Sequence, residues 1–209
     1  MITTVELARR RLHNQRLDGP AGLAKSSLGQ RTEGLTDSDI DSLLADGRIL
    51  RTHILRPTWH FVLPADIRWM MQLTGPRVEL RIRSRTRALD LDERRLTEAY
   101  GVITDALAGG GRLTRRQIGS RLQERGISTD VARLTHIVMH AELNSLICSG
   151  GLDGKEQTYA LFDDRVPPTP VLTPDEALAE LVRRYFTSHG PSSIRDFTWS
   201  ATAASWRCP

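Results

Sequence analysis

The sequence predicts a mainly α-helical α+β protein composed of tandem winged helix-turn-helix units, each with a short β-hairpin as its wing. Three observations lead to this fold class. The middle of the chain has three helical patterns followed by two strand-like runs, which is the winged-helix order. A helix and hairpin pattern precedes it, and a further pair of helical patterns follows it. The units are predicted at residues 1–63, 90–166 and 167–209, with a linker helix at 64–89.

The middle unit, residues 90–166, has the clearest pattern. Its first helix has four apolar residues on one face, Leu96, Tyr100, Ile103 and Leu107, and is followed by a run of glycines. Its second helix is predicted to begin with a capping box of Thr114 and Gln117 and to end at Gly126. Ser128 is expected to open the third helix, whose inner face is formed by Val131, Leu134, Val138 and Ala141. The runs LICS and EQTYALF then predict a hairpin.

In the first unit, the stretch RTHILRPTWHFV, residues 51–62, nearly alternates polar and apolar residues around a Pro-Thr pair. It follows a helix predicted to be capped by Thr36 and to end at Gly47, so it occupies the position of a wing. A wing lies beside the duplex backbone, where arginines meet phosphates and add salt-dependent affinity with little sequence preference. We therefore expect four side chains here to contact DNA: Arg51, His53, Arg56 and His60.

The third unit begins after a proline-rich linker, with a predicted capping box of Thr173 and Glu176. The chain reaches Pro209 where the third helix and wing of this unit are expected, so the unit is predicted to be truncated. Its apolar side chains would then lack part of their cover. The segment is expected to pack back on the middle unit, to self-associate with another copy, or to fray.

The first unit is expected to lack a scaffold helix, which would leave apolar side chains of its capped helix short of cover: Ile40, Leu43 and Leu44. The linker helix is expected to break at Gly75 and Pro76, because proline cannot donate to the helical ladder. Residues 90–166 are therefore predicted to form the stable core and to resist proteolysis as a fragment.

Composition restricts the function classes only loosely. Lys and Arg total 29 against 25 Asp and Glu, a net charge of +4, and nearly all the cations are arginines, whose planar fork suits phosphate. An arginine-rich composition from a GC-rich genome explains this equally well. Cys148 and Cys208 provide neither a disulfide framework nor a metal quartet, and no apolar run approaches a membrane span. We expect a cytoplasmic, nucleoid-associated protein with no membrane contact.

In the middle unit, Arg115 and Arg116 stand at the start of the second helix, where the helix dipole and the side chains both favour phosphate. The third helix would present Thr129, Arg133 and His136 to double-stranded DNA. A solvent-exposed helix explains these three residues equally well. One arginine among them is too little for base readout, so we expect shape and backbone contacts.

Other constellations are weak. His136 and His140 lie one helical turn apart, a spacing that can hold zinc, but no third ligand follows, and we interpret them as surface histidines. Four arginines at alternate positions are spread around a helix and predict a solvated face: Arg81, Arg83, Arg85 and Arg87. An acidic solvent face accounts for Asp39, Asp41 and Asp46. We expect no metal and no cofactor.

Three blocks of the chain, LADGRILRTHILRPTWHFVLPADIRWMMQLTGPRV, GGLDGKEQTYALFDDRVP and RYFTSHGPSSIRDFTW, together resemble the bacterial winged-helix DNA glycosylases of the AlkZ and YcaQ type. The resemblance covers nearly all of residues 1–206. It implies tandem winged-helix units that form a basic concave surface for duplex DNA. It also implies excision of alkylated bases and unhooking of interstrand crosslinks.

The family carries its catalytic residues in a Gln-x-Gln or Gln-x-Asp motif, and this chain has no match to it. Neither Gln15 nor Gln30 has a Gln or Asp two residues later, so no catalytic residue is assigned. The main hypothesis is therefore DNA binding without catalysis. An active glycosylase for alkylated or crosslinked bases is the second hypothesis. The third is an inactive truncated family member, or an interaction protein that works with a partner chain.

Overall fold

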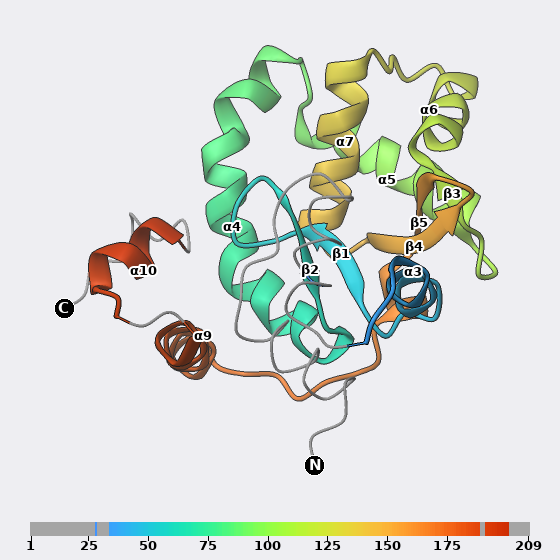
Figure 1. Ribbon diagram of the computed structural model, residues 1–209. Helices are drawn as coiled ribbons and strands as arrows, with labels where there is room; N and C mark the ends of the chain where they lie inside the picture. Colours follow the sequence, from blue (N-terminus) through green and yellow to red (C-terminus); the bar gives the residue numbers. More distant parts are fainter. Residues whose placement is uncertain (1–27, 29–33, 189–190, 201–209) are drawn as a thin grey trace.

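The computed structural model describes residues 28, 34–188 and 191–200. For residues 199 and 200 it describes the backbone only. The predicted α+β class is confirmed, since helices enclose two small antiparallel sheets (Figure 1). The helices are α3 (Asp37–Ala45), α4 (Pro64–Ala88), α5 (Glu93–Leu107), α6 (Arg115–Glu124), α7 (Val131–Leu143), α8 (Phe162–Arg165), α9 (Pro174–Ser188) and α10 (Ile194–Ser200). The strands are β1 (Leu50–His53), β2 (Trp59–Val62), β3 (Leu113–Thr114), β4 (Ile147–Asp153) and β5 (Glu156–Leu161).

Local capping signals place the helix starts as predicted. Thr36 caps α3 in a capping box with Asp39, and Thr114 caps α6 in a capping box with Gln117. The predicted pairing of Thr173 with Glu176 precedes α9 in the same way. One start was wrong: the N-cap of α7 is Asp130, whose carboxylate accepts from two backbone N–H groups of the first turn, and not Ser128.

The middle unit has the predicted order of three helices, α5 to α7, followed by the hairpin β4–β5. The short strand β3 joins that hairpin to give the sheet order β3-β5-β4. One apolar core holds these elements together, formed by residues that include Ile103, Leu107, Ile118, Leu122, Val138 and Ala141. Val131 was expected in this core and is instead 82% exposed, because the later start of α7 puts it in the first turn at the surface.

Helix α4 runs without a break through Gly75 and Pro76, contrary to prediction. Proline forfeits one backbone hydrogen bond, but apolar side chains on both halves of α4 are buried in the same core, which holds the halves in line. Gly75 lies against α7: a Cβ atom at this position would be 3.2 Å from the Leu143 carbonyl oxygen. The absence of a side chain thus allows the two helices to approach closely.

The predicted units share one core across their boundaries. Buried side chains from β1, β2, α4, α7, β4 and α8 form a single cluster that includes Leu50, Val62, Met71, Ile82, Leu143 and Phe162. Helix α3 and strand β1 both pack against β4. The apolar side chains of α3 were expected to remain partly exposed. This expectation was wrong, because Ile40, Leu43 and Leu44 are buried. Residues 90–166 thus enclose one apolar core of their own and also contribute α7, β4 and α8 to this shared cluster.

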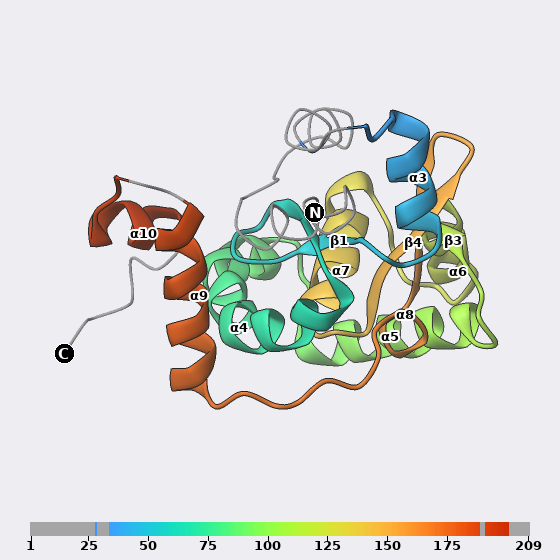
Figure 2. The same ribbon diagram turned by 60° about the horizontal axis from the view of Figure 1, so that its bottom comes forward.

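Helix α9 packs on α4, on the side away from the three-stranded sheet, and α10 follows beside α9 and adds Phe197 to the same apolar cluster (Figures 1 and 2). Leu181 and Phe197 are buried there with Trp69, while Phe186 remains 37% exposed. Arg184 anchors α9, since its guanidinium lies 2.9 Å from the Asp66 carboxylate of α4. Of the three expected outcomes, the segment packs back on the chain, although on the linker helix and not on the middle unit.

Candidate nucleic-acid interface

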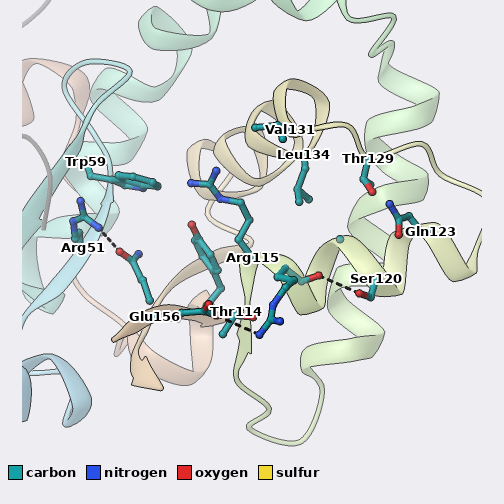
Figure 3. Close-up of a pocket in the computed structure, with 14 residues that line it drawn as sticks. Arg51, Trp59, Thr114, Arg115, Ser120, Gln123, Thr129, Val131, Leu134 and Glu156 are labelled. Carbon is teal, nitrogen blue, oxygen red and sulfur yellow. Dashed lines mark hydrogen bonds and ion pairs between the residues drawn. The ribbon is translucent and has the colours of Figure 1, made fainter. Parts of the chain in front are cut away.

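A cleft of about 630 Å³ separates the first hairpin from helices α6 and α7. Figure 3 shows Arg51 and Trp59 from the hairpin facing Arg115, Val131 and Leu134 across it. Its remaining lining residues are Thr114, Arg116, Gly119, Ser120, Gln123, Thr129, Glu156, Gln157 and Tyr159. The cleft therefore combines three arginines, one tryptophan, neutral polar and apolar side chains, and one carboxylate, Glu156.

On the hairpin side, hydrogen bonds hold both the backbone and the side chain of Arg51 in place. Its backbone N–H donates to Ser149 Oγ at 2.8 Å, and its guanidinium donates to Gln157 Oε1. The guanidinium carbon also lies 4.4 Å from the centroid of the Trp59 ring, a cation–π distance. The side chain is only 5% exposed, and this burial lowers the pKa of Arg51.

Beneath Trp59 lies a buried carboxylate on α7. Oε2 of Glu142 is 2.5 Å from His53 Nδ1, and it accepts from the Trp59 indole Nε1 at 3.4 Å. The His53 and Trp59 rings are 4.9 Å apart. Glu142 is fully buried, and its Oε1 atom has no hydrogen-bond partner among the described residues. These contacts hold the hairpin on α7 and orient the indole toward the cleft.

On the opposite side, the start of α6 brings two arginines to the cleft. Arg115 donates to Thr135 Oγ1 at 3.1 Å, and its guanidinium carbon lies 5.6 Å from the centroid of the Trp59 ring. The Arg116 side chain is 82% exposed, and its nearest carboxylate, Glu156, is 3.9 Å away. The first turn of a helix also presents backbone N–H groups without helical partners. Positive charge thus gathers at the cleft entrance.

The predicted recognition residues of α7 are half-buried. Thr129 lines the cleft, whereas the Arg133 guanidinium donates to the Asp90 carbonyl oxygen at 3.3 Å. The pKa of His136 is lowered, chiefly by burial, and the lower pKa favours the neutral imidazole. His140 is not a surface histidine as expected: it is buried, and its Nε2 lies 2.9 Å from Thr86 Oγ1. Within the described part of the chain, no three potential ligands cluster around a metal position.

The first hairpin is not an exposed wing, which corrects the expectation for three of its residues. Arg51, His53 and His60 are 5%, 7% and 2% exposed, and Arg56 is half-buried. The reason is that β1 packs against β4 and α7, which buries successive residues of the hairpin and not only alternate ones. These side chains position the cleft wall and do not project into solvent.

Sequence reasoning missed Trp59, Glu142 and Gln157. A signal existed for Glu142, since it lies four residues after the inward-facing Val138 and therefore on the buried side of the helix. Gln157 lies in a strand with no distinguishing local pattern. Its role depends on Arg51, which is distant in sequence.

Comparison with known proteins assigns the chain to a protein family. The model of a family described as DNA glycosylase AlkZ-like matches residues 11–207. The chain belongs to the AlkZ-like DNA glycosylase family. Among solved structures, the chain is similar to the Streptomyces sahachiroi DNA glycosylase AlkZ, with a TM-score of 0.71 and 20% identity, over 99% of this chain and 62% of that one. No curated protein matches the sequence.

Membership of the AlkZ-like family confirms the resemblance seen in the sequence and relates the chain to DNA repair. At 20% identity the structural match concerns the fold, and the chain spans about 62% of the length of the matched glycosylase. Among the described helices, none is long and apolar enough to cross a membrane.

Proposed function

We propose that this AlkZ-like protein binds double-stranded DNA through the face that holds the cleft, without excising bases. In this proposal α5, α6 and α7 with the sheet β3-β5-β4 act as a winged-helix unit, and the protein associates with the nucleoid. The observation that carries the proposal is the pair Arg115 and Arg116 at the start of α6. The exposed Arg116 side chain lies at the start of this helix and at the cleft entrance, a position that suits a phosphate.

The buried residues of the hairpin have a different part in this proposal. Arg51 and His53 are occupied by Gln157 and Glu142, so they contribute by holding the cleft wall and not by contacting phosphates. The phosphate contacts come from Arg115 and Arg116, with Thr129 near them. Such contacts add affinity that falls with salt and depends little on sequence.

The test is fluorescence anisotropy of a labelled duplex over a series of salt concentrations. We expect the double variant Arg115→Ala with Arg116→Ala to bind more weakly and to flatten the log–log salt slope by about one to two units, since each neutralised phosphate contributes roughly 0.9. The matched control removes two arginines of the distant helices α9 and α10, Arg183→Ala with Arg195→Ala, and leaves the slope unchanged. Equal slopes for the two double variants would refute the proposed interface.

Base excision is the competing function, and the family membership favours it. Against it stands the lack of a Gln-x-Gln or Gln-x-Asp motif in the sequence. Placed polar groups typically contribute about a hundredfold or more each to the rate of such reactions. We therefore expect the purified protein to release no 7-methylguanine from alkylated duplex above the spontaneous rate. Release well above that rate would establish the glycosylase instead.

A further inference from the structure

We propose that the groove between α4 and α5 is a binding site for a free guanine nucleotide, with the base at one end of the groove and the phosphate at the other. Both helices pack against α7, and the groove between them has a volume of about 720 Å³, within the range of roughly 300–1,000 Å³ that is typical of pockets for small ligands. His140 of α7 lines the groove and lies about half a turn round that helix from Val131, which lines the cleft. The groove is therefore separate from the proposed DNA interface, and the inference does not rest on DNA binding.

The groove is long enough for a nucleoside monophosphate. Glu79, Arg83 and Arg87 of α4 line it and are spaced four residues apart, so they lie on one face of the helix. At about 1.5 Å per residue, roughly 12 Å of helix axis separates Glu79 from Arg87. Tyr100 of α5 lies at the Glu79 end, because Asn144 Nδ2 is 2.7 Å from Glu79 Oε1 and 3.4 Å from the Tyr100 hydroxyl. One end of the groove thus has a carboxylate and an aromatic ring, and the other has a guanidinium.

Glu79 is held in a position from which it can accept hydrogen bonds from a base. Its Oε1 atom accepts from Asn144 Nδ2, and His140 Nδ1 lies 3.6 Å from the same oxygen. His140 is itself buried and fixed by Thr86, whose Oγ1 lies 2.9 Å from the imidazole Nε2. The pKa of Glu79 is lowered, chiefly by His140, so the carboxylate is charged at neutral pH. No described residue donates to Oε2, and the side chain is 38% exposed, so a ligand can reach this carboxylate.

A carboxylate at the end of the groove selects guanine among the bases. The Watson–Crick edge of guanine has two adjacent N–H donors, whereas adenine presents an acceptor at N1, and an ionised carboxylate can only accept. Tyr100 and Leu96 of α5 line the groove and are half-buried, which provides an aromatic and apolar surface for a flat ring. Burial, above all, raises the pKa of Tyr100, so its phenol stays neutral beside Glu79.

The other end of the groove suits a phosphate. Arg83 and Arg87 are exposed and lie one helical turn apart, where like charges repel, and neither guanidinium forms a hydrogen bond within the described part of the chain. The carboxylate of Asp92 is occupied, since it accepts from the Arg95 backbone N–H as the N-cap of α5, and Glu93 is exposed. A phosphate between the two arginines would compensate both charges and accept hydrogen bonds from both.

Isothermal titration calorimetry of the full chain tests the site with four probes: guanosine monophosphate (GMP), adenosine monophosphate (AMP), guanosine and inorganic phosphate. GMP should bind roughly tenfold more tightly than each of the other three, because a hydrogen bond to a charged group contributes on this order. The absence of GMP binding at millimolar concentration would overturn the inference. Equal affinity for GMP and any other probe would overturn it as well, and the proposed DNA binding would stand in either case.

Substitutions assign the two ends of the groove. Arg83→Ala with Arg87→Ala should reduce the affinity for GMP to that for guanosine. Glu79→Gln should bring the affinities for GMP and AMP within about twofold of each other, since an amide can accept from guanine or donate to adenine. The matched control, Arg81→Ala with Arg85→Ala, removes two exposed arginines of the same helix that do not line the groove, and it should leave GMP binding unchanged. Equal losses in the two double variants, or a preference for GMP over AMP that survives Glu79→Gln, would refute the site.

Discussion

Glu142 illustrates at the residue scale how one buried charge connects distant parts of the chain. Its carboxylate contacts His53 and Trp59, which lie 89 and 83 residues earlier in the sequence. A buried carboxylate is costly unless hydrogen bonds and charge compensate it. Both partners come from the first hairpin, so the position of that hairpin depends on this one side chain.

We predict that Glu142→Gln destabilises the fold by about 1–3 kcal/mol, because the neutral amide is a weaker hydrogen-bond acceptor than the carboxylate for the buried His53 and Trp59 groups. Urea unfolding followed by circular dichroism measures the change. Glu98→Gln is the control, since Glu98 is a half-exposed residue of α5 and its loss should change stability by less than about 0.5 kcal/mol. Equal midpoints for the two variants would show that the buried pair contributes nothing.

At the scale of elements, the packing of α4 on α7 depends on a glycine. A methyl group at Gly75 would meet the Leu143 backbone oxygen at 3.2 Å, and a backbone atom cannot rotate away as a flexible side chain can. Gly101 in α5 differs, since a Cβ atom there has no neighbour within 4 Å. The two helical glycines therefore separate the effect of packing from that of helix propensity.

We predict opposite signs for the two alanine variants. Gly101→Ala should stabilise the protein by about 0.5–1 kcal/mol through its helix propensity and the reduced freedom of the unfolded chain. Gly75→Ala has the same gain but incurs an overpacking cost of roughly 1–3 kcal/mol, so it should be destabilising. Thermal unfolding should show one melting temperature above the original and one below, by about 2–4 °C per kcal/mol. If both variants were stabilised, the close approach of α4 and α7 would be unimportant.

At the scale of the whole molecule, one of the apolar cores crosses the predicted unit boundaries. Side chains of β1 and β2 and of α4 are buried with those of α7, β4 and α8. A fragment beginning at Asp90 would expose this shared surface. The exposed segment after Val166, by contrast, links α8 to α9 and includes Val171, which is 77% exposed.

We therefore expect limited proteolysis with thermolysin to cut first near Val171 and to leave a resistant fragment that retains α3 to α8. Mass spectrometry of the products identifies its ends. The fragment over 90–166 that the sequence predicts is the alternative outcome of the same digestion. A resistant product that begins near Asp90 would show that the middle unit is stable without the first hairpin and α4.

The fold and the candidate site differ in how far the sequence predicts them. Capping residues such as Thr36 and Thr114, and the order of helices and hairpin in the middle unit, followed from local patterns. The arginines at the start of α6 were also found in this way. Trp59 and Gln157 were not, because their roles arise from contacts between segments about a hundred residues apart.

The sequence by itself determined where α3 and α6 begin, because a capping side chain satisfies an N–H group only three residues away. It also determined the family, through blocks of residues read in order. Only the tertiary structure decided that the first hairpin is buried and that α9 docks on α4. Alternation along a strand shows that one of its two faces is buried, but not what covers it, and both faces of this hairpin are largely covered. The cover comes from β4 and α7, and these long-range contacts are what form the cleft around Trp59.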